Sequence, residues 1–156
     1  MSDTASKIVS LCGNNGLQKK VRDVVKNFEL TDEERKKIKQ FAETHLVDLY
    51  KMGLEYSLSL SDDDYAEDEK EHMESDFNTQ LNYWWIEMQS EWIRYNNLIN
   101  YKMMIKGESD PVLEAKGSIC SLFLEPVAKL LDTEELKTNI NNLQTLVERS
   151  KNESMF

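Results

Sequence analysis

The sequence contains few of the residues that cross-link or interrupt a chain. Its 156 residues include only two cysteines, two prolines, five glycines and two histidines. Two thiols cannot build the disulfide-dense scaffold of a small secreted protein. The low glycine and proline content excludes collagen-like and linker-like chains. What remains is a chain of regular secondary structure, and its length suits one domain of the usual size, about 100–200 residues.

Long apolar runs are missing as well. The longest stretches without a polar interruption, such as residues 83–86 and 122–124, are a few residues long, whereas a membrane helix needs about 20. The opening MSDTASKIVSLC is broken by charged and hydroxyl side chains, unlike a signal peptide with a continuous apolar segment. We therefore expect a cytoplasmic protein without a membrane partner, or one of the host cytoplasm or nucleus if the source is a virus.

The residues that are present favour helix almost throughout. Apolar positions recur at intervals of three and four, which is the spacing of an amphipathic helix. Thr31 and Glu34 form a capping box, and Asp110-Pro111 places a good N-cap before a proline at the first helical position. The predicted helices cover residues 4–12, 17–28, 31–60, 61–106, 110–131 and 132–151. The sequence thus predicts an all-α fold, a single-domain bundle of five or six helices over residues 1–151, with a flexible C-terminal tail at 152–156.

The helix predicted before Gly107 is long and rich in aromatic residues. Seven of the 14 aromatic side chains lie between residues 77 and 101. Because its apolar residues occupy most of its circumference, we expect it to be central and buried. Trp85 and Trp92 are seven residues apart and share the main apolar stripe. Trp84 lies beside this stripe, and we predict it as an exposed anchor for a partner, because binding hot spots favour tryptophan.

The net charge of −10 is concentrated in one segment. Residues 62–76 hold nine acids and one lysine, which gives −8, and the other 141 residues together carry −2. Acids in the first turn of a helix are favoured by its dipole, but those further along repel one another at i,i+4 spacing. This excess indicates a binding surface, with solubility as the alternative purpose of the charge. The candidate binding residues are Asp62, Asp63, Asp64, Glu67, Asp68, Glu69, Glu71, Glu74 and Asp76, together with Trp84.

The charge pattern predicts a non-enzymatic binding protein whose acidic segment engages a basic surface on a partner protein. Its concrete form is a viral or phage-type stoichiometric inhibitor or nucleic-acid mimic, since helical carboxylates can imitate a row of phosphates. The overall acidity argues against direct nucleic-acid binding. Residues 19–39 net +3 and are expected to be ordinary helix surface, or to meet the acidic segment within the molecule or in a neighbouring copy.

Two alternatives remain open. The first is a helical adaptor or assembly module that binds a partner helix or forms a homo-oligomer through apolar helix faces, especially the stripe from Leu136 to Val147. The second is a metal-dependent enzyme.

Little in the sequence favours catalysis. Glu69 and His72 match the Glu-x-x-His pattern of di-iron proteins, but such a site needs two copies of this pattern and the chain has one. His45 could pair with Cys12 or Cys120 as a nucleophilic couple, yet His45 falls on an apolar helix stripe and Cys120 lies in an apolar stretch. We therefore predict no catalytic residue, no metal site and no cofactor.

Overall fold

The computed structural model describes residues 2–60, 65–131 and 145. Within the first two of these ranges the regular structure is entirely helical, as predicted. The elements are α1 (Ser2–Leu11), α2 (Leu17–Asn27), α3 (Asp32–Leu60), α4 (Glu67–Tyr101), the π-helical η1 (Lys102–Lys106) and α5 (Pro111–Ala128). The prediction of an all-α single bundle is confirmed with five α-helices in these ranges. The helix predicted over residues 132–151 and the tail at 152–156 lie outside the described residues, apart from residue 145.

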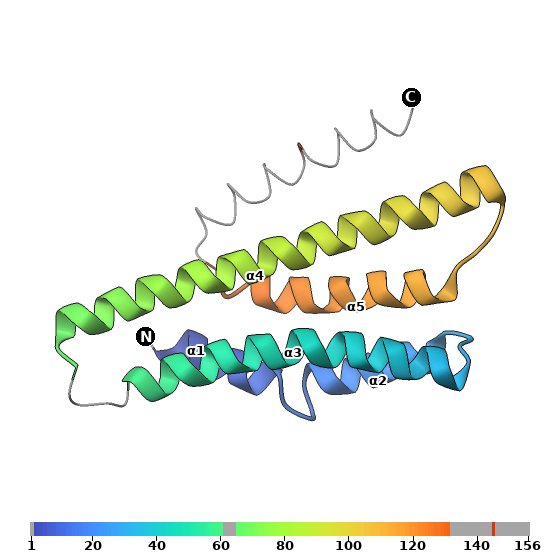
Figure 1. The fold of residues 1–156 in the computed structure, drawn as a ribbon. Helices are drawn as coiled ribbons and strands as arrows, with labels where there is room; N and C mark the ends of the chain where they lie inside the picture. The colour runs from blue at the N-terminus through green and yellow to red at the C-terminus, as the bar shows by residue number, and fades with distance from the viewer. Residues whose placement is uncertain (1, 61–64, 132–144, 146–156) are drawn as a thin grey trace.

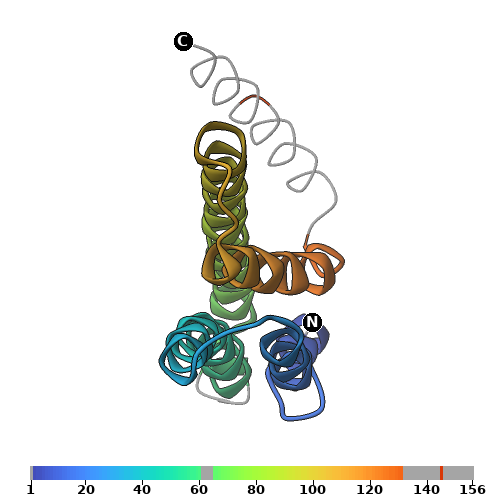
Figure 2. The same cartoon turned by 90° about the vertical axis from the view of Figure 1, so that its right-hand side faces the viewer.

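The helices form two layers. Helices α4 and α5 make a hairpin, which packs on a second layer in which α1 and α2 follow one another along the side of α3 (Figures 1 and 2). Helix α3 contacts every other α-helix, including α4 and α5 above it. The core therefore lies between the layers and is filled from both.

Helix α3 begins at the predicted cap. The backbone N–H of Glu34 donates to Thr31 Oγ1 at 3.1 Å, and the backbone N–H of Thr31 donates to Glu34 Oε1 at 2.9 Å. Two donors that would be unsatisfied at a helix start are thus paired reciprocally.

The buried face of α3 follows helical spacing and leaves room for α1 at one point. Its buried apolar residues are Ile38, Ala42, Leu46, Leu49 and Tyr56. At Gly53 the first helix comes so close that an added Cβ would lie 3.1 Å from the γ-carbons of Ile8 and Val9. The absence of a side chain at Gly53 is therefore what permits the α1–α3 contact.

Helix α4 and η1 together run from Glu67 to Lys106, 35 residues followed by five. The helix starts later than predicted: Ala66 occupies the N-cap, where it makes no side-chain bond, and the predicted caps at 61–64 lie outside the described residues. It ends where predicted, since Gly107 adopts a left-handed φ of +66° and closes the last turn. Its middle is held to α5 by Trp85, whose Nε1 donates to the carbonyl of Leu124 at 3.0 Å.

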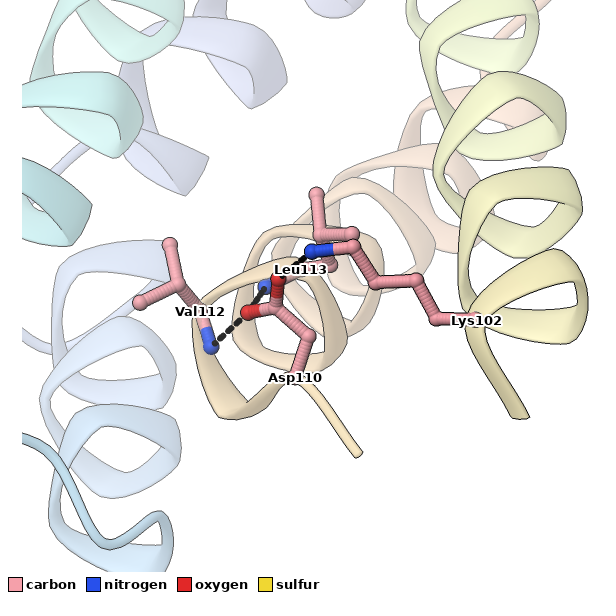
Figure 3. Close-up of polar contacts among 4 residues, drawn as sticks. All are labelled: Lys102, Asp110, Val112 and Leu113. Atoms are coloured by element: carbon pink, nitrogen blue, oxygen red, sulfur yellow. Dashed lines mark hydrogen bonds and ion pairs between the residues drawn. The ribbon is translucent and has the colours of Figure 1, made fainter. Parts of the chain in front are cut away.

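The turn from η1 into α5 is fixed by Asp110. One carboxylate oxygen of Asp110 accepts from the backbone N–H groups of Val112 at 3.1 Å and Leu113 at 3.2 Å, and the other accepts from Lys102 Nζ at 2.5 Å (Figure 3). Asp110 is thus the N-cap of α5, as predicted. Its bond to Lys102 also links η1, at the end of the first arm of the hairpin, to the start of α5.

The burial expected of the long helix does not extend to its C-terminal end. Tyr101, Met103 and Met104 are exposed there. The second layer does not cover this end, because α4 and α3 diverge toward it (Figure 1). Composition alone could not show where the covering helices are absent.

Candidate functional site

The predicted acidic segment lies at the start of α4. Six of its nine acids are described, and they occupy about three turns of helix: Glu67, Asp68, Glu69, Glu71, Glu74 and Asp76. Five of these side chains are exposed and Glu74 is half-buried. Asp62, Asp63 and Asp64 lie outside the described residues. We refer to the six described acids as the acidic face of α4.

The acidic face has no ionic partner within the described part of the chain. The ion pairs found there join Arg35 to Asp32, Arg94 to Glu91 and Lys102 to Asp110. Glu67, Asp68 and Glu69 sit in the first turn, where the helix dipole stabilises negative charge. Glu71, Glu74 and Asp76 lie beyond the first turn, where the helix dipole gives less stabilisation. None of the described residues forms an ion pair with them.

The basic residues between 19 and 39 do not neutralise the acidic face. They lie on α2 and at the start of α3, at the opposite end of the bundle from the start of α4 (Figure 1). The suggested contact between the two segments inside one molecule is therefore wrong for the residues described. Charge is instead separated along the long axis of the bundle, and a contact between copies stays a prediction.

Trp84 is not an exposed anchor. Its side chain is only 7% exposed and packs against Phe123 of α5, with ring centroids 6.5 Å apart. The reason is that α4 is covered by both α3 and α5, so the buried surface is wider than the single stripe assigned from the sequence. Its indole Nε1 is buried and finds no hydrogen-bond partner among the described residues.

Two exposed aromatic residues flank the acidic face, Tyr65 before it at 37% exposed and Tyr83 beyond it. Tyr83 is the more exposed of the two. Its side chain is 65% exposed. Residues seven apart on a helix lie almost directly above one another, because seven residues make nearly two turns. Glu69, Asp76 and Tyr83 follow this spacing, so two carboxylates and a phenol share one exposed face of α4. Their spacing of seven is a signal in the sequence, but the predicted anchor was the neighbouring Trp84 and not Tyr83.

His45 is a packing residue in this structure. It is half-buried and meets the ring of Phe41 edge-on, with centroids 4.8 Å apart. Burial lowers the pKa of His45, while the nearby carboxylates of Glu91, Asp48 and Glu87 oppose that shift. The lowered pKa favours the neutral form of His45, which packs against Phe41 more readily than a charged ring would.

The two thiols are buried and unsuited to nucleophilic chemistry. Burial raises the pKa of Cys12 to about 11 and that of Cys120 to about 12. Both thiols are therefore protonated near neutral pH, and the thiolate is the reactive form. His72 is exposed on α4, and the described residues contain no group of three or more His, Cys, Asp or Glu side chains placed to hold a metal ion.

Comparison with known proteins adds no family or function. No family model matches the chain, and no similar curated protein or solved structure was found.

Proposed function

We propose that this chain is a non-enzymatic binding protein that engages a basic surface on a partner protein through the acidic face of α4 and Tyr83. A stoichiometric inhibitor or nucleic-acid mimic of the kind that viruses and phages direct against host enzymes is the concrete form of this function. Such a protein needs a rigid scaffold and an accessible row of negative charges.

The observation that carries the proposal is the exposure of carboxylates without internal partners. An acid that pairs within its own molecule has little to offer a partner, whereas an exposed and unpaired one can form a charge-assisted hydrogen bond. Glu67, Glu71 and Glu74 lie on successive turns of α4, about 5.4 Å apart along the axis, and Glu69 and Asp76 lie two turns apart on another side of the helix. Phosphates repeat along a DNA strand at a spacing of the same order, which supports the mimic in particular.

Tyr83 supplies the apolar part of the surface. Charge steers two proteins together and sets specificity, but most binding energy comes from a few desolvated anchors that are often tyrosine, tryptophan or arginine. Tyr83 lies one and two heptads beyond Asp76 and Glu69 on the same face. A partner contact over this face would bury the ring and leave the carboxylates at its rim.

The test compares the full chain with a variant carrying Glu69→Gln, Asp76→Asn and Tyr83→Ser. Each form is immobilised and exposed to extract of the native host, and retained proteins are identified by mass spectrometry. Binding of the purified partner is then measured by calorimetry at low and moderate salt. We expect a basic partner that the variant fails to retain, and an affinity that falls steeply with salt. A mimic further predicts that duplex DNA competes with the chain for the partner.

A matched control removes two charges elsewhere, as many as the test variant. Glu55 on α3 and Glu125 on α5 are exposed, so changing both to Gln alters net charge equally but spares the acidic face. This control should bind like the native chain. Equal losses in both variants, or an affinity indifferent to salt, would refute the proposal.

The adaptor alternative is supported by a different observation. Helix α3 exposes Val47, Tyr50 and Leu58, and the first two border a hollow of about 600 Å³ between α3 and the α1–α2 turn. A partner helix lying there would bind through apolar contacts and be insensitive to salt. Substitution of Tyr50 by Ser distinguishes this function, since it should abolish such binding and spare binding through α4.

A further inference from the structure

Three consecutive large apolar side chains of the described chain are exposed together at one end of the bundle. Met103, Met104 and Ile105 of η1 are 51%, 84% and 68% exposed. We refer to these three residues as the apolar tip. Single exposed apolar residues are ordinary on a protein surface, but a contiguous group of large ones marks a contact site.

The backbone that presents the tip is held on both sides. Lys102 Nζ is bound to Asp110 (Figure 3). The carbonyl of Lys102 accepts from the backbone N–H of Glu108 at 3.1 Å. Gly107 closes the turn in a left-handed conformation. The tip is therefore a preformed knob, and π-helical turns of this kind are often found at functional sites.

The directions of the three side chains decide which occupant fits. Residues of an α-helix are about 100° apart around the axis, and somewhat less in the wider π-turn. Met103 and Ile105 therefore point to nearly opposite sides, with Met104 between them. All three are exposed, so the apolar surface extends around the turn and is not confined to one side of it. A bilayer surrounds an inserted turn from every side, whereas one flat protein surface covers only one.

We propose that the apolar tip inserts into the interfacial region of a lipid bilayer and makes the protein a reversible peripheral membrane binder. Its neighbours suit that position: Tyr101 is exposed, and tyrosine is enriched at membrane interfaces. Lys106 follows the tip and is exposed, with a long aliphatic stem that can lie along lipid while its ammonium group stays in water. Insertion of this kind needs no spanning helix, and none of the described helices is long and apolar enough to cross a membrane.

The local charge predicts how the tip binds. Lys102 and Lys106 are balanced by Glu108 and Asp110, so residues 102–110 carry no net charge. The acidic face of α4 lies at the far end of the bundle (Figure 1). Binding therefore rests on apolar burial, and attraction to anionic lipid plays no part in it. The exposure of the tip is a property of the fold, so a membrane partner was not predicted from the sequence.

Flotation of the full chain with phosphatidylcholine vesicles tests the proposal. We expect the native chain to float with the vesicles, and to remain bound as sodium chloride is raised from about 20 to about 500 mM. The triple variant Met103→Ser, Met104→Ser and Ile105→Ser should show a partition coefficient at least tenfold lower. Leu58→Ser is the control, because Leu58 is 63% exposed on α3 and lies outside the tip; it should float like the native chain.

A second measurement follows the tip itself. An environment-sensitive dye on Met104→Cys should shift its emission to the blue on addition of the same vesicles, whereas the dye on Leu58→Cys should not. The native thiols Cys12 and Cys120 are buried, so labelling is directed to the new cysteine. An unchanged dye at position 104, or a native chain that does not float, would overturn the proposal.

Two further outcomes are decisive. In the first, neither the native chain nor the triple Ser variant binds vesicles, and the native chain self-associates whereas the variant does not. The tip would then be a contact between copies, and the lipid proposal would be wrong. The variant with Glu69→Gln, Asp76→Asn and Tyr83→Ser should still float like the native chain. Loss of flotation in that variant would overturn the assignment to the tip, whereas failure of the acidic face to bind a basic partner leaves flotation unchanged.

Discussion

Replacing Asp110 tests how the two arms of the α4–α5 hairpin are joined. Asp110→Ala removes the cap bonds to Val112 and Leu113 and the ion pair with Lys102 together. Asp110→Asn keeps an oxygen that can accept the two cap bonds but removes the charge. Lys102→Met removes the ion pair and leaves the cap intact. These three variants separate the two roles of a single carboxylate.

The magnitudes follow from the contacts. Loss of an N-cap costs typically about 1 and at most about 2 kcal/mol. The Lys102–Asp110 pair lies near solvent, so it contributes at most about 1 kcal/mol. Asp110→Ala should therefore lower the free energy of unfolding by about 1–3 kcal/mol, and Asp110→Asn and Lys102→Met by about 1 kcal/mol or less. For a chain of this size each kcal/mol corresponds to a fall in Tm of roughly 2–4 °C.

Urea unfolding followed by circular dichroism measures these differences. A double-mutant cycle on Lys102 and Asp110 isolates the ion pair, because Asp110→Asn should add little to a chain that already carries Lys102→Met. The reasoning is refuted if Asp110→Ala is no more destabilising than Asp110→Asn, since the cap bonds would then contribute nothing. Strict additivity of Lys102→Met and Asp110→Asn would likewise refute the ion pair.

The same carboxylate predicts a pH dependence. The hydrogen bond from Lys102 lowers the pKa of Asp110 below its usual value of 3.8, helped by the two backbone N–H groups and opposed by burial. A lowered folded-state pKa means that the stabilisation is fully present above pH 3.8 and is lost as the pH falls through the lower, folded value. The stability gap between the native chain and Asp110→Asn should thus be constant near neutral pH and shrink in this acidic range.

Three further predictions follow from the core. Gly53→Ala should destabilise the fold by about 1–3 kcal/mol, because its Cβ meets α1 at 3.1 Å. Gly117→Ala on α5 is the control; its nearest neighbour is 3.8 Å away, so in denaturant unfolding it should be neutral or stabilising. Burial lowers the pKa of His45 from 6.5, so the free energy of unfolding should decline as the pH falls below 6.5 toward the pKa of the folded state. His45→Gln should remove this decline, which urea unfolding at a series of pH values measures. The thiols of Cys12 and Cys120, with pKa values raised to about 11 and 12, should react with a disulfide reagent at pH 8 only as fast as the chain opens; rapid labelling of the native protein would contradict their burial.

Helix ends were predictable because their causes are local. The capping box at Thr31 and Glu34, the Asp110-Pro111 start and the glycine stop at Gly107 each involve residues within a few positions of one another, and all three are present. The late start of α4 at Glu67 shows the limit of this logic. Several residues upstream were suitable caps, and the sequence alone did not distinguish among them.

Burial was less predictable because it depends on partners that are distant in the sequence. Trp84 and Phe123 are 39 residues apart, and only the folded hairpin brings them into contact. The periodic pattern of α4 shows that apolar residues surround much of the helix, but it cannot show that α5 covers Trp84 and leaves Met104 in water. The acidic face was easier to locate, since charged side chains at a helix start reach solvent in almost any packing.

The placement of the tryptophans gives the two layers different spectroscopic signatures. Trp84, Trp85 and Trp92 all lie on α4, and the first two contact α5, whereas α1, α2 and α3 contain none. Intrinsic tryptophan fluorescence therefore reports on the α4–α5 hairpin, while far-ultraviolet circular dichroism reports on every helix. Coincident transitions from the two signals would show that both layers unfold as one cooperative unit. An earlier loss of dichroism at constant fluorescence would show that the hairpin persists after the α1–α3 layer has come apart.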